Sequence, residues 1–541
     1  MKSLSSLKLH FLVCLMGAIA CLSSASAATH PVSGEKLAAE QVFTYRMAAE
    51  PPSIDPQLVE DVEGSAVARD LFEGLLTQKA DGSLAPGVAE RWELNPAKTI
   101  YTFHLRKNAR WSNGDAVTAH DFVYAWRRAV DPKLASPYAG YLELTTLKNV
   151  GAVIRGERPT SALGVTAIDD YTLQAELDAP LAYFPTMLVH ATTMPTPRRV
   201  IEQHGDNWTR AGNLVGNGAY LLTEHVLNER MVRVRNPLYW NNQQTILDKV
   251  IGLIINDESQ AYNRYQANEL DKTEVPTGQF RRLQKERPLE TFSSPRLCSY
   301  YYMFNLNKAP FDDQRVRQAL SYAIDRDIIT NNILGAGQIP AYTFTPGSTA
   351  NFSVPDVALA SMSRNDRIKT ASALLAEAGY GPSRPLKTTI FYNTSEGHKK
   401  IAIAISQMWK QRLGVQVTLQ NQEWKTFLST RGSGDFEIAR GAWCGDYNEA
   451  STFLDLMRSG SDQNDMRYKN ERIDQLLAEA RTLADPNPNY TEIENIIAAE
   501  APIIPIYHYT GVMLLKPYVK GWPHQNVEAN WYAREMYITE H

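Results

Sequence analysis

Cysteine is scarce in this chain, with four residues among 541. No Cys-x-x-Cys or His-Glu-x-x-His motif occurs, and histidine and cysteine do not cluster. Because zinc and related metals need three or four such ligands close together, the sequence does not indicate a metal site. We therefore predict neither a bound metal nor a cofactor.

An excess of one charge is also missing. The chain has 55 Lys and Arg against 59 Asp and Glu, a formal net charge of −4, and it has no long basic block. Binding to nucleic acid needs clustered cations that neutralise phosphates. The charge pattern therefore predicts no nucleic-acid partner.

The sequence motifs of common enzyme active sites are absent too. The sequence contains no Gly-x-Ser-x-Gly elbow, no phosphate-binding Gly-x-x-x-x-Gly-Lys-Ser/Thr loop, and no Gly-x-Gly-x-x-Gly after a strand. The acid pair Asp312 and Asp313 stands at a predicted helix start, where capping accounts for it. We therefore predict that the protein is not an enzyme, and a secreted peptidase is the rival from that class.

Only the first residues form a long apolar run. Phe11 to Leu22 is apolar but too short to span a bilayer, and Lys2 and Lys8 supply a positive start. Ala25-Ser26-Ala27 is a small-x-small cleavage site. Residues 1–27 are therefore predicted to be a signal peptide, and the protein to be exported to the periplasm.

Attachment of a lipid at Cys21 is the alternative fate of this leader. Cys21 follows Ala18-Ile19-Ala20, which lacks the Leu three positions before the cysteine that a lipid-attachment box carries. The sequence therefore does not favour a lipoprotein.

Two cysteines remain after the leader, Cys298 and Cys444. An even pair in an oxidising compartment predicts one disulfide, and the alternative is two buried free thiols. The bond would close a loop of about 146 residues, worth at most about 5 kcal/mol in a chain-entropy treatment.

Strand and helix patterns alternate along the chain, which predicts an α/β protein. Residues 101–105 alternate apolar and polar side chains, as a half-buried strand does. Thr118 with Asp121 three positions later predicts a helix start, and Asp312 predicts another. A run of apolar residues from 371 to 378 predicts a helix that stops at Gly379.

Charged, aromatic and thiol side chains lie close together in the segment 440–449. Arg440, Trp443, Cys444 and Asp446 lie within seven positions, after the strand-like run 436–439. An apolar wall that carries one Asp and one Arg suits a zwitterion, with the Asp on an ammonium and the Arg on a carboxylate. A free peptide has these two ends. The alternative is a buried ion pair with core aromatics.

Several motifs in a fixed order carry a family resemblance. They are residues 69–75 (RDLFEGL), 103–107 (FHLRK), 111–114 (WSNG), 121–124 (DFVY), 421–426 (NQEWKT) and 446–449 (DYNE). With these motifs the chain resembles the oligopeptide-binding proteins of bacterial ABC importers, the extracellular solute-binding family 5, over essentially the whole mature sequence. The resemblance implies an α/β fold of two lobes, a periplasmic binding protein of the type II-like, Venus flytrap kind, with an additional α+β domain.

The resemblance also implies domain boundaries and a ligand cleft between lobes that hinge shut. Lobe I is expected to comprise residues 28–72, 195–297 and 514–541, the additional domain 73–194, and lobe II 298–513.

Two branches of the family compete. Residues 392–396, 398–404 and 501–507 resemble the murein-peptide-binding branch. Cys298 and Cys444 fall where the general oligopeptide binders have their disulfide, which the murein-peptide branch lacks. Thr273 and Glu274 depart from the general binders, where small polar and amide residues stand, so backbone contacts to ligand are in doubt there.

The resemblance assigns ligand-binding roles to particular positions. Asp446 would bind the peptide's α-ammonium, and Arg440 and His398 would meet carboxylates. The alternatives are a structural ion pair for Arg440 and a structural role for His398. Backbone atoms around Ala442 and Cys444 would pair with the peptide.

Five further positions would line the cleft. Trp424 and Trp443 would line side-chain pockets, Tyr138 and Tyr509 would reach the ligand, and Glu60 would face a basic side chain. Simple packing or surface exposure is the alternative for each of them.

The predicted function is that of a periplasmic substrate-binding component of an ABC-type peptide importer. It would be a monomer that binds short peptides and delivers them to membrane permease subunits driven by a separate ATPase. The first alternative is a binding protein specific for a murein tripeptide. A metal-chelate or haem binder of the same family is a lesser one, disfavoured because no Met/His-rich cluster occurs.

Overall fold

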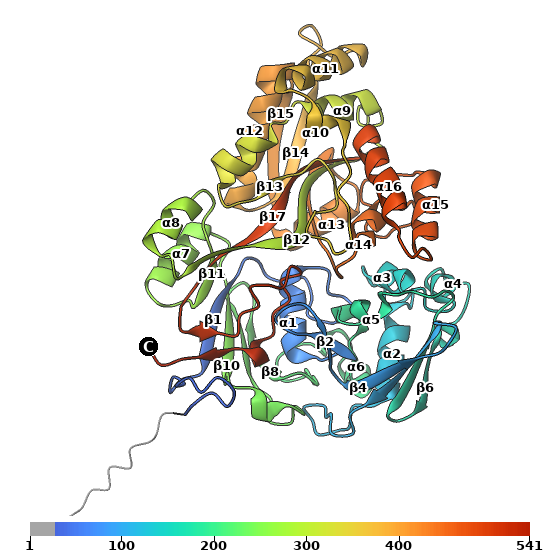
Figure 1. Cartoon of the computed structure of the whole chain (residues 1–541), viewed down its shortest axis with the longest axis vertical. Coiled ribbons are helices and arrows are strands. Elements are labelled where there is room, and N and C mark those ends of the chain that lie inside the picture. Colours follow the sequence, from blue (N-terminus) through green and yellow to red (C-terminus); the bar gives the residue numbers. More distant parts are fainter. Residues whose placement is uncertain (1–27) are drawn as a thin grey trace, which may run out of the picture.

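The computed structural model describes residues 28–541. The predicted signal peptide, with Cys14 and Cys21, lies outside this range. The described chain forms an upper and a lower part, joined by two long strands (Figure 1). Between residues 28 and 541 no helix has both the length and the apolar character needed to cross a bilayer.

One mixed sheet runs through both parts. Its strands, in spatial order, are β15 (Gln416–Gln422), β14 (Lys387–Asn393), β16 (Ile438–Cys444), β12 (Thr291–Phe304), β17 (Ile503–Leu515), β11 (Lys272–Glu274), β1 (Val42–Met47), β10 (Lys249–Ile254), β9 (Arg230–Arg235) and β8 (Tyr220–Val226), with β13 (Ile339–Pro340) paired to β17 beside this path.

Strands β12 and β17 connect the two parts. In the lower part, residues 291–295 of β12 pair with residues 510–514 of β17, and β17 continues onto β11. In the upper part, residues 298–304 of β12 pair with β16. The ladder between β12 and β17 is irregular between Pro295 and Ser299, where the chain passes from one part to the other. The irregularity lies close to the predicted lobe boundary at 297/298, whereas on β17 it falls between His508 and Thr510, before the predicted boundary at 513/514. Both boundaries stay predictions.

The upper part surrounds its strands with helices. They are α9 (Gln314–Tyr322), α10 (Ala358–Ser361), α11 (Arg364–Glu377), α12 (Glu396–Leu413), α13 (Trp424–Gly432), α14 (Ser451–Leu454), α15 (Glu471–Ala480) and α16 (Asn487–Glu500). Helix α11 ends before Gly379, which has a φ of +84°, as predicted. The expected cap of α9 at Asp312 is wrong by one residue. Asp313 caps the helix, because its carboxylate accepts a hydrogen bond from the Arg315 N–H at 2.9 Å.

The lower part contains a second, antiparallel sheet, β4 (Ala89–Leu94), β5 (Ile100–Leu105), β7 (Thr172–Glu176) and β6 (Val165–Asp169). With it lie α2 (Ala119–Ala129), α3 (Ala139–Leu144), α4 (Val150–Ile154) and α5 (Phe184–Met187). The predicted alternation of β5 is confirmed, and Thr118 and Asp121 form the predicted capping box at α2. This α+β unit lies within the range proposed for the additional domain.

The remaining elements complete the lower part. They are α1 (Val62–Leu71), α6 (Arg198–His204), α7 (Glu258–Gln266), α8 (Phe280–Glu286), and the short pairs β2 (Leu76–Gln78) with β3 (Leu84–Pro86) and β18 (Val519–Lys520) with β19 (Tyr537–Ile538). The C-terminal tail therefore returns to the lower part, as β18 and β19 pack near β1 in Figure 1.

The buried side chains separate along the same division. One cluster joins the lower sheet to the additional α+β unit and includes Phe43, Phe72 and Trp126. Two others lie in the upper part, around Tyr300 and Phe453. Because each part has its own core, the two parts can move relative to each other about the connecting strands with most of both cores intact. Tyr447 of the upper part is an exception, since it is buried in the cluster of the lower part and stacks on Tyr183 with ring centroids 5.4 Å apart.

Candidate functional site

A pocket lies where the two parts meet. From the lower part it is lined by Tyr138, Gly140, Tyr141 and Leu144, and from the upper part by Trp443, Asp446, Thr452, Asp455, Leu456, Ser461, Asp462 and Gln463. The cavity between these side chains is small, about 20 Å³, which is room for about one water-sized group. Two of the predicted ligand-binding aromatics and the predicted ammonium-binding acid thus face one pocket.

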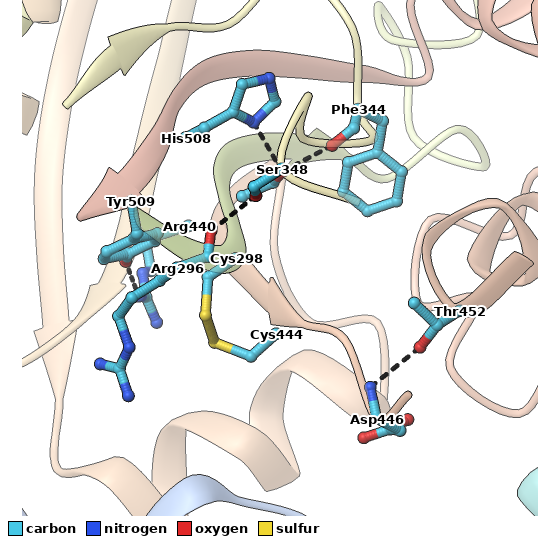
Figure 2. The surroundings of a disulfide bond; sticks show 11 residues. Arg296, Cys298, Phe344, Ser348, Arg440, Cys444, Asp446, Thr452, His508 and Tyr509 are labelled. Atoms are coloured by element: carbon cyan, nitrogen blue, oxygen red, sulfur yellow. Dashed lines mark hydrogen bonds between the residues drawn. A yellow bond between two sulfur atoms is a disulfide. The ribbon is translucent and has the colours of Figure 1, made fainter. Parts of the chain in front are cut away.

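Asp446 is the second residue after the end of β16. Its backbone N–H donates to the Thr452 hydroxyl at 3.0 Å, which fixes the turn (Figure 2). Its side chain is 13% exposed. Burial raises the pKa of this carboxyl well above its ordinary value, and the negative charges of Glu528 and Asp462 raise it further.

The Asp446 carboxylate has no cationic partner in the described part of the chain. No Lys or Arg nitrogen of residues 28–541 lies within 4.0 Å, and the nearest basic group is His190, whose Nε2 is 3.5 Å from Oδ1. A buried carboxylate in such surroundings is costly when ionised. A ligand ammonium would supply the missing positive charge.

Arg440 lies in β16, six positions before Asp446, and is also buried. Its Nη2 donates to the Tyr509 hydroxyl at 2.9 Å and its Nη1 to the Asn393 side-chain oxygen at 3.4 Å. Among residues 28–541 no carboxylate oxygen is within 4.0 Å of the guanidinium, and its Nε has no hydrogen-bond partner. The structural ion pair considered for Arg440 is therefore not present, and the charge is left for an anion.

His398 lies beside Arg440. It is in the first turn of α12, and its ring centroid is 5.6 Å from that of Tyr300, over which the Arg440 guanidinium lies at 5.1 Å. Burial lowers the pKa of His398 well below its ordinary value, and the charge of Arg440 lowers it further. A neutral His398 can donate one hydrogen bond to a carboxylate that Arg440 binds.

The predicted disulfide is confirmed, and the free-thiol alternative is wrong. Cys298 of β12 and Cys444 of β16 stand opposite each other in the ladder and are bonded. Figure 2 shows Arg440 and Asp446 on opposite sides of this bond. The disulfide thus ties the strand that carries Arg440 and leads to Asp446 to a strand that connects the two parts.

One edge of β16 is open where these residues lie. Strand β14 pairs only with Ile438 and Ala439, whereas β12 pairs with β16 as far as Cys444. From Arg440 onward, the side of β16 away from β12 therefore has no strand partner among residues 28–541. Such an edge can pair with the backbone of an extended peptide, which is the role expected around Ala442 and Cys444.

The other predicted residues divide between the pocket and the contact surface. Tyr138 stacks on Trp443 with ring centroids 6.3 Å apart, and the buried Nε1 of Trp443 has no hydrogen-bond partner. Trp424 instead donates from Nε1 to Asp61 of the lower part at 2.9 Å. Glu60 is half-buried beside Arg431, and burial raises its pKa.

Several contacts close the two parts onto each other. The Gly140 N–H donates to Asp462 at 2.9 Å, Gln463 donates to the Pro137 carbonyl at 2.7 Å, and Arg458 lies 3.2 Å from Glu143. The structure is therefore in a closed arrangement, with the additional α+β unit in direct contact with the upper part.

His190, Asp61 and Asp462 were not predicted from the sequence. Each acts on a residue far away along the chain, and Asp61 and Trp424 are 363 positions apart. The only local signal is that Asp61 directly follows Glu60, which was selected. Among residues 28–541 no group of three or more His, Cys, Asp or Glu is arranged to hold a metal ion.

Closure of the unliganded protein is expected to be favoured by acid. Burial raises the pKa of Asp61 to about 7 and of Asp462 to about 6, and both contact the opposite part. The closed form therefore binds protons that the open form, with exposed acids of pKa about 4, has lost. The stabilisation of the closed form relative to the open form is complete below about pH 4 and is lost as the pH rises through 6 to 7.

Small-angle X-ray scattering of the unliganded protein checks this expectation. The radius of gyration should be smaller at pH 5 than at pH 7.5. Asp61→Asn keeps an acceptor for Trp424 but cannot titrate, so the dependence on pH should be weaker in this variant. An unchanged dependence in the variant would show that Asp61 is not responsible.

The sequence of this chain is similar to a known protein family and to known relatives. Residues 83–465 match the family model described as "Bacterial extracellular solute-binding proteins, family 5 Middle". The periplasmic oligopeptide-binding protein OppA of Salmonella typhimurium is 44% identical over 532 residues, which are 97% of this chain and 98% of the relative.

Solved structures are similar over nearly the same length. The Escherichia coli murein tripeptide binding protein MppA has a TM-score of 0.92 at 46% identity, with 93% of this chain and 100% of that chain covered. Haemophilus influenzae OppA in complex with RPPGFSPFR has a TM-score of 0.91 at 41% identity, with the same coverage. Both confirm the predicted two-lobed α/β fold.

One of the similar solved structures is in an open form, and its lobe arrangement differs from that of this chain. Against unliganded, open MppA, at 46% identity and with 94% of this chain and 99% of that chain covered, the TM-score is 0.67. The lobes of this chain are thus arranged differently from that open form, as the direct contacts between them require. With the family match, the identities and the shared fold, the chain belongs to the bacterial extracellular solute-binding proteins of family 5.

Proposed function

We propose that this protein is the periplasmic substrate-binding component of an ABC-type peptide importer. It binds short peptides between its lobes by their charged ends and an extended backbone. The observation that carries the proposal is Asp446, a buried carboxylate beside a pocket with no Lys or Arg within 4.0 Å among residues 28–541. An α-ammonium has the charge and size for that position.

The spacing of the charged residues supports a peptide of a few residues. Asp446 is six positions after Arg440, and a strand rises about 3.3 Å per residue, so their backbones are at most about 20 Å apart. An extended peptide of about three to five residues spans such a distance. The open edge of β16 lies between the two charges and can pair with its backbone.

The names of the relatives agree with this ligand class. The compared OppA proteins are oligopeptide-binding, and one was solved with the peptide RPPGFSPFR. In this chain the bound peptide is held without covalent chemistry. Closure of the lobes then presents the loaded monomer to permease subunits, and a separate ATPase drives transport. The leader of residues 1–27 delivers the protein to the periplasm.

A murein tripeptide is the second candidate ligand. The likeness to MppA, with a TM-score of 0.92 at 46% identity, favours it. The Cys298–Cys444 disulfide favours the general oligopeptide binders, in which the family resemblance implies a disulfide at these positions. Arg440 and His398 together suit a ligand with more than one carboxylate, and a diaminopimelate-containing tripeptide has several.

Isothermal titration calorimetry tests the proposal with three ligands. Tri-alanine, N-acetyl-tri-alanine and a diaminopimelate-containing murein tripeptide are titrated into protein freed of its bound ligand. Tight binding of tri-alanine with weak binding of the acetylated form supports a general peptide binder. Binding of the murein tripeptide alone assigns the second candidate. Failure of all three ligands to bind would overturn the proposal.

Replacement of Arg440 by Met is expected to weaken tri-alanine binding by about 2 kcal/mol, a factor of roughly 30, because hydrogen bonds to a charged group are lost. Methionine keeps an apolar side chain of similar length. C-terminally amidated tri-alanine should already bind weakly and should lose little more in the variant. Equal losses for acid and amide, measured by calorimetry, would show that Arg440 does not bind the carboxylate.

A further inference from the structure

His190 is the polar group of the lower part that faces Asp446. It comes just before a short 3-10 helix at Ala191–Thr193, in the additional α+β unit. Its Nε2 is 3.5 Å from the Asp446 Oδ1, and the two side chains are 11% and 13% exposed. The acid expected to bind the ligand thus has a neighbour from the opposite part of the molecule.

The orientation of the His190 ring is fixed on three sides. It stacks on Tyr138 at 5.1 Å between ring centroids and lies against Tyr141 at 4.4 Å. Its Nδ1 accepts a hydrogen bond from the Thr192 N–H at 3.3 Å, and the Thr192 hydroxyl is 3.1 Å from the same nitrogen. Few other ring orientations are compatible with these contacts.

The same contacts determine where the proton of the ring lies. A backbone N–H can only donate, so Nδ1 must carry a lone pair. In the neutral ring the proton is then on Nε2, the nitrogen that faces Asp446. Burial and, to a smaller extent, the charge of Arg69 lower the pKa of His190 to about 3, so the ring is neutral at physiological pH.

We propose that His190 is a positioning residue for the ligand ammonium, because its neutral ring donates from Nε2 to the Asp446 carboxylate and leaves the negative charge uncompensated. This inference rests on the proposed function, in which Asp446 binds the α-ammonium. A cation in place of His190 would pair with Asp446 and compete with the ligand. An apolar residue would leave the carboxylate without a donor on that side. A neutral donor meets both needs.

At 3.5 Å the His190 Nε2 and the Asp446 Oδ1 lie at the long limit of a hydrogen bond. Hydrogen bonds of functional groups tighten when a charged ligand binds beside them. Ionisation of Asp446 by the bound ammonium strengthens its attraction for the Nε2–H. The lower part thereby contributes to recognition of the peptide's amino end, whereas Asp446 belongs to the upper part.

The test compares tri-alanine with N-acetyl-tri-alanine by calorimetry in full-length mature protein. His190→Phe keeps a flat ring between Tyr138 and Tyr141 but has no donor, and the ratio of the two affinities should fall about tenfold. His190→Gln restores a neutral donor and should recover most of the ratio. His190→Lys should weaken tri-alanine about 100-fold and leave the acetylated peptide nearly unchanged.

A double-mutant cycle separates positioning from packing. In an Asp446→Asn background, His190→Phe should leave the ratio unchanged, because no carboxylate remains to be held. If the ratio in His190→Phe equals that of the unmodified protein, the inference is overturned. If that variant does not fold, equal ratios in the Gln and Lys variants overturn it. A ratio of one in the unmodified protein would instead overturn the ammonium role of Asp446 in the proposed function.

Discussion

Alanine in place of Asp446 is expected to weaken the binding of tri-alanine by about 3–5 kcal/mol, or roughly 10²- to 10⁴-fold in Kd. The closed lobes bury the ligand ammonium, and without Asp446 they leave it without a counter-charge. Asp455 and Asp462 line the same pocket, but Asp455 is paired with Arg458 at 2.8 Å and Asp462 already accepts a hydrogen bond from the Gly140 N–H. Calorimetry of the variant and the unmodified protein measures the loss.

Asp446→Asn is the matched control for shape. It keeps the size of the side chain and loses only the charge, so it should lose most of the same affinity. N-acetyl-tri-alanine should bind about equally weakly to the unmodified protein and to both variants. If acetylated and free peptides bind the unmodified protein with equal affinity, Asp446 does not recognise an ammonium.

Loss of the disulfide is expected to have the largest effect on stability. Cys298 and Cys444 are 146 positions apart, and opening so long a loop lowers the free energy of unfolding by at most about 5 kcal/mol in a chain-entropy treatment. The paired replacement Cys298→Ser and Cys444→Ser removes the bond without leaving a reactive thiol. The unfolding midpoint in urea should therefore be clearly lower for the double variant.

Reduction of the unmodified protein provides the control for the serine substitutions. With reductant its midpoint should approach that of the double variant, and the double variant itself should not respond to reductant. Because the chain has more than one core, each transition should be followed with probes in both parts. Identical midpoints for the oxidised protein and the double variant would contradict the expected stabilisation.

The chemistry of the site was visible in the sequence where it is local. Arg440, Trp443, Cys444 and Asp446 lie within seven positions, and their residue types alone indicate a ligand with two charged ends. The capping box at Thr118 and the stop at Gly379 are local for the same reason, since a cap involves neighbours three or four positions apart.

Features that depend on contacts between residues far apart in the sequence could not be predicted from it. The sequence indicated a strand at 436–439, but β16 runs from Ile438 to Cys444 because β12 pairs with it as far as Cys298. His190 likewise has no local feature that marks it as a neighbour of Asp446. Such contacts are set by tertiary structure, which overrides local pattern in strands especially.

Mass spectrometry of the ligand released from protein purified without denaturation is the decisive test of peptide recognition through the amino end. We expect an assortment of short-peptide masses, each with a free amino end that reacts with an amine label. A single mass of a diaminopimelate-containing tripeptide would assign the protein to murein-peptide recycling instead. Only non-peptide molecules, or only peptides with blocked amino ends, would contradict the claim that Asp446 selects a peptide ammonium.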